Sequence, residues 1–226
     1  MARIAAVLLL AALPGVPASA QDLTVLIQPP PAADDPRTIR DIAMLRGLQA
    51  SRTPDGVRAA QADVDESAFL FQSVLGPGFD ARRLPRTADL MARAGEAASA
   101  AMNRAKAVWN RPRPSSVAPH LRPCLPVPAT SSYPNGHAVL GMVYAGLLGR
   151  MLPEHRAALF ARAREYAEHR EACGLHFPGG YRGRLRRRRG HWHRLPCPGA
   201  GRHRPDRAAP RPGPARRPAR AADGCA

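Results

Sequence analysis

The sequence lacks several patterns that would define a fold or a function at once. It contains no apolar run of the ~20 residues needed to span a bilayer. No segment alternates apolar and polar residues convincingly, as β-strands do. The histidines and cysteines match no established zinc-binding spacing, so we expect neither a metal nor another cofactor. These absences favour an all-α domain that is not embedded in a membrane.

Lysine is almost absent. Lys106 is the single lysine among 34 basic residues. The net charge of +17 is also divided unevenly, because residues 179–226 carry +12 of it. A strongly basic chain commonly binds nucleic acid or an anionic membrane, but residues 1–178 do not share that excess. We therefore expect neither nucleic acid nor a membrane as a partner.

Three short runs contain a recurring set of cations and imidazoles. Six residues separate Lys106 from Arg113-Pro114, Gly136-His137 follows Pro134, and five residues separate Arg170 from His176. Phosphoryl transfer needs such groups, because its catalysis is mostly positioning and neutralisation of spread negative charge. Each run alone occurs by chance in many proteins. The ordered trio predicts a phosphate site.

The trio resembles the signature of the bacterial class A non-specific acid phosphatases, in the superfamily of type 2 phosphatidic-acid phosphatases and vanadium haloperoxidases. That signature reads Lys, six residues, Arg-Pro; then Pro-Ser-Gly-His; then Ser-Arg, five residues, His, three residues, Asp. The similarity covers roughly residues 53–178. It implies a single-domain, all-α helical bundle over residues 21–178. It also implies hydrolysis of small-molecule phosphate monoesters at acidic pH.

The resemblance assigns roles to the matching residues. His176 would attack phosphorus to form a phosphohistidine, and His137 would protonate the leaving alcohol. An acidic optimum follows if His137 is protonated while His176 is neutral, with both pKa values near the ordinary value of about 6.5. The residues expected to bind phosphate are Lys106, Arg113, Asn135, Gly136 and Arg170.

Three positions depart from the signature. Asn135 and His169 replace its two serines, and Gly180 replaces its aspartate. The amide of Asn135 can still donate a hydrogen bond. Gly180, by contrast, removes the carboxylate that would orient the imidazole of His176. A catalytically impaired secreted protein that binds phosphate or polyanions is therefore the alternative function, and a vanadium-dependent haloperoxidase is a third.

Residues 179–226 form a tail rich in arginine and proline, with few residues able to build a core. This composition predicts disorder. Reading the codons from Gly179 one base later permits Ala-Asp-Thr-Glu-Ala-Gly, which restores the aspartate of the signature. We therefore hypothesise that the tail is a frameshift product. An evolved basic arm is the alternative.

The first 20 residues have the composition of a secretory signal peptide. A basic start is followed by the apolar run Ile4–Leu13 and by the small residues 18–20. The predicted mature chain begins at Gln21 and is periplasmic, and homo-oligomerisation is left open. Export permits disulfides, and we expect Cys124 to pair with Cys173, which ties two motif loops together. Two unpaired core cysteines are the alternative.

Capping residues and apolar periodicity locate the helices. Helices are predicted from Thr53 to about Leu75, from Thr87 past Lys106, over residues 138–152, and from Pro153 to about Cys173. The helix over residues 138–152 is too apolar for a surface position, so we expect it to be central and buried. Its N-terminus would direct backbone N–H groups at an anion.

Overall fold

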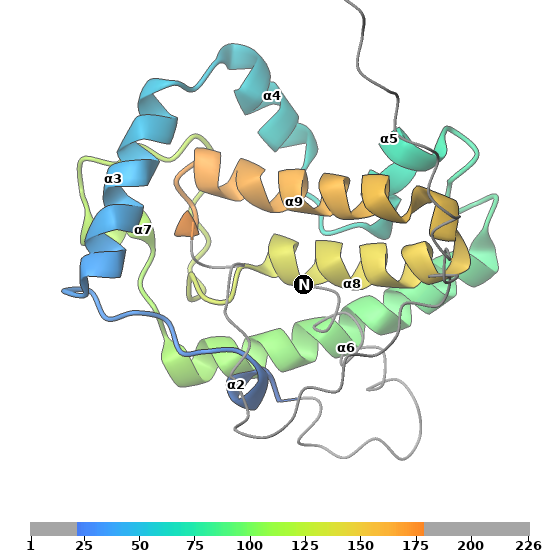
Figure 1. The fold of residues 1–226 in the computed structure, drawn as a ribbon, viewed down its shortest axis with the longest axis horizontal. Helices are drawn as coiled ribbons and strands as arrows, with labels where there is room; N and C mark the ends of the chain where they lie inside the picture. The colour runs from blue at the N-terminus through green and yellow to red at the C-terminus, as the bar shows by residue number, and fades with distance from the viewer. Residues whose placement is uncertain (1–21, 179–226) are drawn as a thin grey trace, which may run out of the picture. The chain divides into compact units, whose positions relative to one another are not determined.

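The computed structural model describes residues 22–178, and every regular element in that range is a helix (Figure 1). This confirms the predicted all-α class. The predicted signal peptide, residues 1–20, and the predicted disordered tail, residues 179–226, lie outside the described residues. Within the described range, no helix combines the length and the apolar character that crossing a membrane requires.

The helices are, in chain order, α2 (Leu23–Leu26), α3 (Pro36–Ala50), α4 (Pro54–Ala62), the 3-10 helix η2 (Ala68–Phe71), α5 (Gln72–Leu75), α6 (Pro85–Trp109), α7 (Pro114–Val117), α8 (Gly136–Met151), the 3-10 helix η3 (Pro153–His155) and α9 (Arg156–Ala172).

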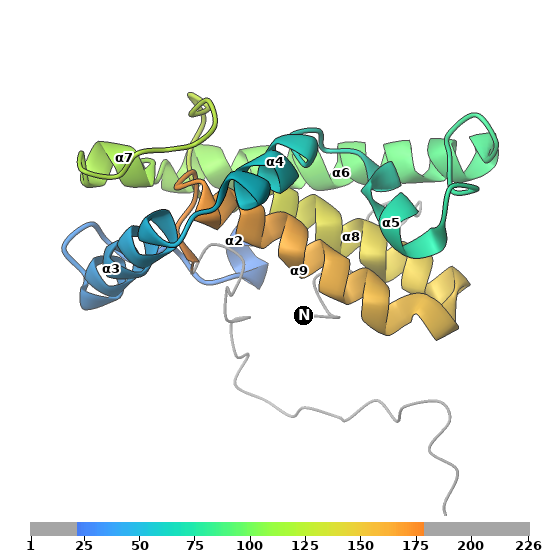
Figure 2. The same cartoon turned by 90° about the horizontal axis from the view of Figure 1, so that it is seen from above.

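Helix α8 forms the centre of the core. Apart from His137, Arg150 and Met151, all of its residues are buried. It packs lengthwise against α9 and also against α6 (Figures 1 and 2). Close packing with α9 is possible because Gly141 faces Tyr166, whose ring would lie 3.3 Å from an added β-carbon. The expectation of a central, buried helix is therefore confirmed.

Four predicted helix boundaries differ from the structure by two or more residues, and the starts of α8 and α9 differ by only two and three. The helix capped by Thr53 ends at Ala62 rather than near Leu75, because the chain turns at Asp63, whose carboxylate binds side chains of α9. Helix α6 begins at Pro85, ahead of the predicted cap Thr87. The fixed φ of proline suits the first position of a helix and starts α6 two residues earlier.

Helix α3 was not predicted from the sequence. Asp35 caps it by accepting a hydrogen bond from the backbone of Arg37 at 2.7 Å. Only Thr38 and Leu45 of this helix are buried, so it shows little amphipathic periodicity. Sequence patterning detects a helix through its buried face, and α3 hardly has one.

Candidate phosphate-binding active site

The structure brings six of the seven predicted catalytic and phosphate-binding residues to the wall of one cavity of about 380 Å³. The cavity lies where the C-terminal end of α6, the N-terminal end of α8 and the C-terminal end of α9 converge (Figure 1). These six residues are Lys106, Arg113, Gly136, His137, Arg170 and His176.

The chain after α6 is shaped to place two cations on this wall. Lys106 lies in the last turn of α6, which ends where Asn110 adopts the left-handed conformation with φ of 38°. Asparagine tolerates that conformation better than most residues. Arg113 follows in extended backbone immediately before Pro114. The turn therefore sends the chain away from the helix axis and directs both side chains toward one cavity.

His176 is held between two fixed partners. Its Nε2 lies 2.8 Å from Nη1 of Arg113, and its Nδ1 lies 2.7 Å from the carbonyl oxygen of Ser132. A carbonyl oxygen can only accept, so Nδ1 carries the proton. A guanidinium N–H can only donate, so Nε2 offers its lone pair. The hydrogen bonds therefore select the neutral tautomer with its nucleophilic nitrogen on the side of Arg113.

The environment also fixes the charge of His176. Burial lowers its pKa well below the ordinary value, and the nearby Arg113 cation lowers it further. The expectation of a pKa near 6.5 is therefore wrong for this histidine, since it remains uncharged at mildly acidic pH. The Ser132 carbonyl orients the ring within the described residues, and Gly180 lies outside them.

Arg113 is anchored at several points. Its guanidinium donates to the carbonyl oxygens of Thr130, at 2.8 Å, and of Leu175, at 3.1 Å. A further bond reaches the Thr130 hydroxyl at 3.1 Å. Burial lowers the pKa of Arg113 to about 10, so the side chain keeps its charge at any physiological pH. Arg113 is therefore a rigid cation beside the lone pair of His176.

Both ring nitrogens of His137 face acceptors. Nε2 lies 3.1 Å from the carbonyl oxygen of Val64, and Nδ1 lies 3.2 Å from a carboxylate oxygen of Glu66. Both hydrogen bonds form only when each nitrogen carries a proton. The ring also packs on Tyr166, with centroids 4.7 Å apart. The surroundings of His137 thus offer two acceptors, whereas those of His176 offer one acceptor and one donor.

Arg170 is the most deeply buried of the predicted cationic ligands, with 3% of the residue exposed. It donates to the carbonyl oxygen of Ala60, whereas its Nε has no hydrogen-bond partner among residues 22–178. Burial lowers the pKa of Lys106 as well as that of Arg170. Buried cations on a cavity wall favour an anionic ligand, because its charge would offset their desolvation.

Asn135 is the predicted ligand that does not line the cavity. Its Oδ1 caps α8 by accepting from the backbone N–H of Ala138 at 3.5 Å. Its amide nitrogen is buried and has no partner in the described part of the chain. Asn135 thus begins the helix whose first residues, Gly136 and His137, reach the cavity.

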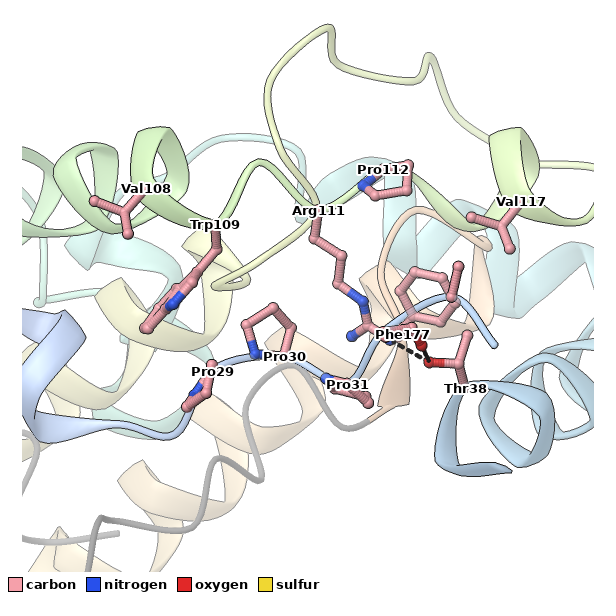
Figure 3. Close-up of a pocket in the computed structure, with 12 residues that line it drawn as sticks. Pro29, Pro30, Pro31, Thr38, Val108, Trp109, Arg111, Pro112, Val117 and Phe177 are labelled. Carbon is pink, nitrogen blue, oxygen red and sulfur yellow. Dashed lines mark hydrogen bonds between the residues drawn. The ribbon is translucent and has the colours of Figure 1, made fainter. Parts of the chain in front are cut away.

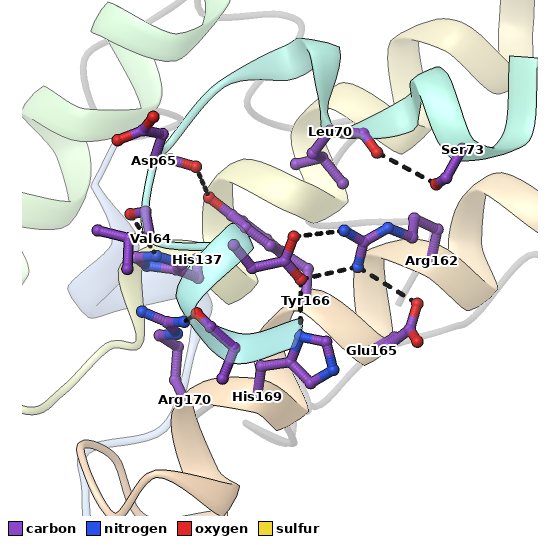
Figure 4. A network of polar contacts seen from close by, with 12 residues as sticks. Val64, Asp65, Leu70, Ser73, His137, Arg162, Glu165, Tyr166, His169 and Arg170 are labelled. Atoms are coloured by element: carbon purple, nitrogen blue, oxygen red, sulfur yellow. Dashed lines mark hydrogen bonds and ion pairs between the residues drawn. The ribbon is translucent and has the colours of Figure 1, made fainter. Parts of the chain in front are cut away.

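A buried ionic network holds the segment that faces His137 (Figure 4). Asp63 binds both terminal nitrogens of Arg162, one of them at 2.9 Å, and it lies 2.7 Å from Nδ1 of His169. The hydroxyl of Tyr166 donates to the carbonyl oxygen of Asp65. These bonds tie residues 63–65 to α9. They thereby set the position of the Val64 carbonyl oxygen that binds His137.

We expect Asp63→Asn to lower the free energy of unfolding by about 3 kcal/mol at pH 6, because it leaves Arg162 without its buried counter-ion. Burial raises the pKa of Asp63, but the bonds from His169 and Arg162 prevail and hold it at about 2. The stabilisation is therefore complete above the unfolded-state pKa of about 3.8 and disappears as the pH falls through 2.

Chemical denaturation of wild type and Asp63→Asn from pH 7 to pH 2 checks this expectation. The control is Asp89→Asn, since Asp89 forms an exposed pair with Arg93 and should contribute little. A stability difference that stays constant down to pH 2 would contradict the assignment of Asp63 as the titrating group.

Cys124 and Cys173 form a disulfide in the structure, with Cα atoms 4.8 Å apart. The backbone N–H of Cys124 also donates to the carbonyl oxygen of Cys173 at 3.2 Å. This link joins the proline-rich loop before α8 to the end of α9. It lies three residues before His176 and so restrains the segment that carries this histidine.

A second cavity has a volume of about 280 Å³ (Figure 3). Its wall contains Trp109, a run of three prolines at residues 29–31, and Arg111. The Arg111 guanidinium lies 3.8 Å from the ring centre of Phe177 and donates to the Thr38 hydroxyl at 3.2 Å. Arg111 therefore already has partners in Thr38 and Phe177. Its contact with Phe177 restrains the residue next to His176.

Sequence reasoning did not predict three contacts that define the site. Glu66 carries no motif signal, and backbone carbonyls such as those of Ser132 and Val64 have no residue-type signal at all. The helix predicted from Thr53 to about Leu75 includes Asp63, so the sequence gives no indication of the Asp63 network. Only a break in the apolar periodicity after Ala62 would have indicated the turn.

Comparison with known proteins finds similarity to acid phosphatases. The chain is 28% identical over 166 residues to an acid phosphatase of Zymomonas mobilis, covering 69% of this chain and 62% of that protein. It is 29% identical over 164 residues to the non-specific acid phosphatase of Salmonella typhimurium, and 30% identical over 164 residues to that of Salmonella typhi.

The chain is similar to acid phosphatases. Each Salmonella alignment covers 67% of this chain and 64% of the relative. The chain thus spans less than two thirds of the length of the curated relatives it matches. No family model matches it.

Proposed function

We propose that this protein hydrolyses phosphate monoesters through a phosphohistidine intermediate. The observation that carries the proposal is the neutral imidazole of His176, whose Nε2 lies 2.8 Å from Arg113 on the wall of a cavity that Lys106 and Arg170 also line. A nucleophile with its lone pair directed into a group of cations is what attack on an anionic phosphate requires. The similarity to acid phosphatases supports the same reaction.

In the first step, the lone pair on Nε2 of His176 forms a P–N bond while the bond from phosphorus to the ester oxygen breaks. Arg113 must release Nε2 for this attack, and its N–H can then turn to a phosphate oxygen. Nδ1 keeps its proton and donates it in a hydrogen bond to the Ser132 carbonyl oxygen, which stabilises the positive charge formed on the ring. The leaving oxygen takes a proton from His137.

In the second step, water attacks the phosphohistidine. His137, neutral after the first step, accepts the proton of the water, and Nε2 of His176 leaves with the electron pair of the P–N bond. Inorganic phosphate is released, and both histidines return to their initial protonation states. The cycle needs one acid and one nucleophile. The hydrogen bonds of the ligand-free site favour N–H groups on His137 and a lone pair on Nε2 of His176, which suits these two roles.

The phosphate oxygens would be bound by a group that we call the phosphate cage, namely Lys106, Arg113 and Arg170. Arginine forks match the geometry of phosphate oxygens, and the first N–H groups of α8 add donors at its N-terminus. The buried, unpartnered Nε of Arg170 is the second feature that favours an anion there. Gly136 would let the helix backbone approach the phosphate closely.

We expect Lys106→Ala and Arg170→Ala each to weaken competitive inhibition by orthovanadate or inorganic phosphate by about tenfold to a hundredfold, because each removes a charge-assisted contact. Inhibition constants against p-nitrophenyl phosphate at mildly acidic pH measure the effect. Arg93→Ala, at an exposed position of α6, is the matched control and should change nothing. Chelators should not alter the rate. Unchanged inhibition in both cage variants would rule out the phosphate cage.

The alternative function is phosphate or polyanion binding without efficient turnover. The observation that favours it is Gly180, which occupies the position of the signature aspartate. Phosphate release from p-nitrophenyl phosphate separates the two functions, since a pure binding protein would retain vanadate affinity but release no phosphate. Resequencing the gene around codon 179 tests the frameshift hypothesis. We also propose that the protein is exported to the periplasm, because residues 1–20 have the composition of a signal peptide.

A further inference from the structure

The cationic cavity already contains an anion from the protein itself. Glu66 lines the cavity together with Lys106, Arg170 and His137, and its side chain is 42% exposed. The hydrogen bond from His137 is the main factor that lowers the pKa of Glu66, and the charges of Lys106 and Arg170 contribute. Glu66 is therefore a carboxylate on the cavity wall that pairs with His137 and is stabilised by the charges of Lys106 and Arg170.

The position of the carboxylate relative to α8 is equally specific. A β-carbon added at Gly136 would lie 2.7 Å from Oε1 of Glu66, which is closer than real contacts allow. The space beside the first residue of α8 is thus filled by a carboxylate oxygen. Helix N-termini attract anions through their free N–H groups and dipole. In the ligand-free site, the carboxylate of Glu66 lies beside this end of the helix.

The hydrogen bonds of His137 also indicate that Glu66 is the group that moves. Nε2 is bound to a backbone carbonyl oxygen of the anchored segment, whereas Nδ1 is bound to the side chain of Glu66. A proton can reach a leaving oxygen only if one of these bonds breaks. The bond to Glu66 is the one that can break by side-chain rotation alone, because Val64 is tied down by the neighbouring Asp63 network.

We propose that Glu66 is an internal substitute for the substrate phosphate, lying in the cationic cavity between His137 and the first residue of α8 when no ligand is bound and rotating out when a phosphate ester enters. This inference rests on the proposed phosphate site and adds to it a residue that regulates ligand affinity. Between turnovers, Glu66 neutralises buried cations that would otherwise repel one another. Substrate affinity is correspondingly weaker than the cage alone would give, since every ligand competes with a tethered carboxylate.

Glu66→Gln separates this role from a purely positioning role. Glutamine keeps an oxygen that can accept from His137 but removes the charge. We expect inorganic phosphate to bind the full-length variant about tenfold more tightly than wild type, as measured by isothermal titration calorimetry near pH 6. The melting temperature of Glu66→Gln without phosphate should be lower than that of wild type, because the cage loses its counter-ion. The rise in melting temperature on adding phosphate should be larger than in wild type.

Glu154→Gln is the matched control. Glu154 lies in η3, beyond the C-terminal end of α8 and so about 20 Å from the site along that helix. The phosphate affinity of Glu154→Gln should equal that of wild type. Glu66→Asp offers a second variant, since it keeps the charge on the loop but withdraws it from Gly136, and phosphate binding should again tighten.

The outcomes are distinguishable. Unchanged or weaker phosphate binding by Glu66→Gln would overturn the substitute role while leaving the phosphate site intact. If wild type and Glu66→Gln both fail to bind phosphate or vanadate, the phosphate site itself is wrong and the inference fails with it. Tighter binding in Glu66→Gln that is lost again in Glu66→Gln combined with Lys106→Ala would support both.

Discussion

His176→Ala should lower the rate of p-nitrophenyl phosphate hydrolysis by at least about a thousandfold and abolish any trapped phosphoenzyme. The substitution removes the atom that forms the P–N bond, and no neighbouring group replaces it, because the side chain beside Nε2 is the cation Arg113. Rapid quenching in alkaline detergent after mixing with radiolabelled substrate, followed by detection of acid-labile, base-stable label on the protein, measures the intermediate.

The loss must be separated from a loss of structure. His176 is buried and bonded at both nitrogens, so its removal also frees Arg113 and leaves a small void. His176→Ala should nevertheless still bind vanadate or phosphate, since the phosphate cage remains. His155→Ala, in η3 at the far end of α8, is the matched control and should retain full activity. A phosphoenzyme that persists in His176→Ala would identify a different nucleophile.

His137→Ala should reduce turnover in a way that depends on the leaving group. A general acid contributes about a hundredfold to ten-thousandfold when the leaving oxygen needs a proton. Alkyl phosphates need one, whereas nitrophenolate leaves readily without it. We therefore expect a much larger loss of kcat/KM with an alkyl phosphate than with p-nitrophenyl phosphate.

The comparison of the two substrates protects this prediction from a purely structural effect. Loss of the packing between His137 and Tyr166 would reduce both rates alike. Formation of the phosphoenzyme from p-nitrophenyl phosphate should survive in His137→Ala and not in His176→Ala. Equal losses on the two substrates would show that His137 is not the acid, and the roles of the two histidines would have to be reassigned.

The two predictions depend on different kinds of contact. His176 owes its neutral tautomer to a backbone carbonyl oxygen and a guanidinium, which are both fixed in the fold. The two ring nitrogens of His137 face a carbonyl oxygen and the carboxylate of Glu66, whose side chain can rotate. In the proposed mechanism, attack by His176 therefore requires Arg113 to release Nε2, whereas proton donation by His137 requires Glu66 to leave.

Several features followed from the sequence alone. Cap residues and the uniformly apolar run after His137 predicted a central buried helix, because an all-apolar helix has no face to offer to water. Motif spacing brought Lys106, Arg113, Arg170 and both histidines into one hypothesis. Their meeting at one cavity agrees with it, although their catalytic roles stay predictions.

Tertiary structure alone decided the rest. The pKa of His176 depends on burial and on Arg113, which is 63 residues away in sequence, so motif spacing could not predict it. The end of α4 depends on a bond from Asp63 to Arg162, 99 residues later. Glu66 enters the cavity through a loop with no motif. Local sequence encodes periodicity and caps, whereas desolvation, tautomers and counter-ions arise from groups that only folding brings within a few ångströms of one another.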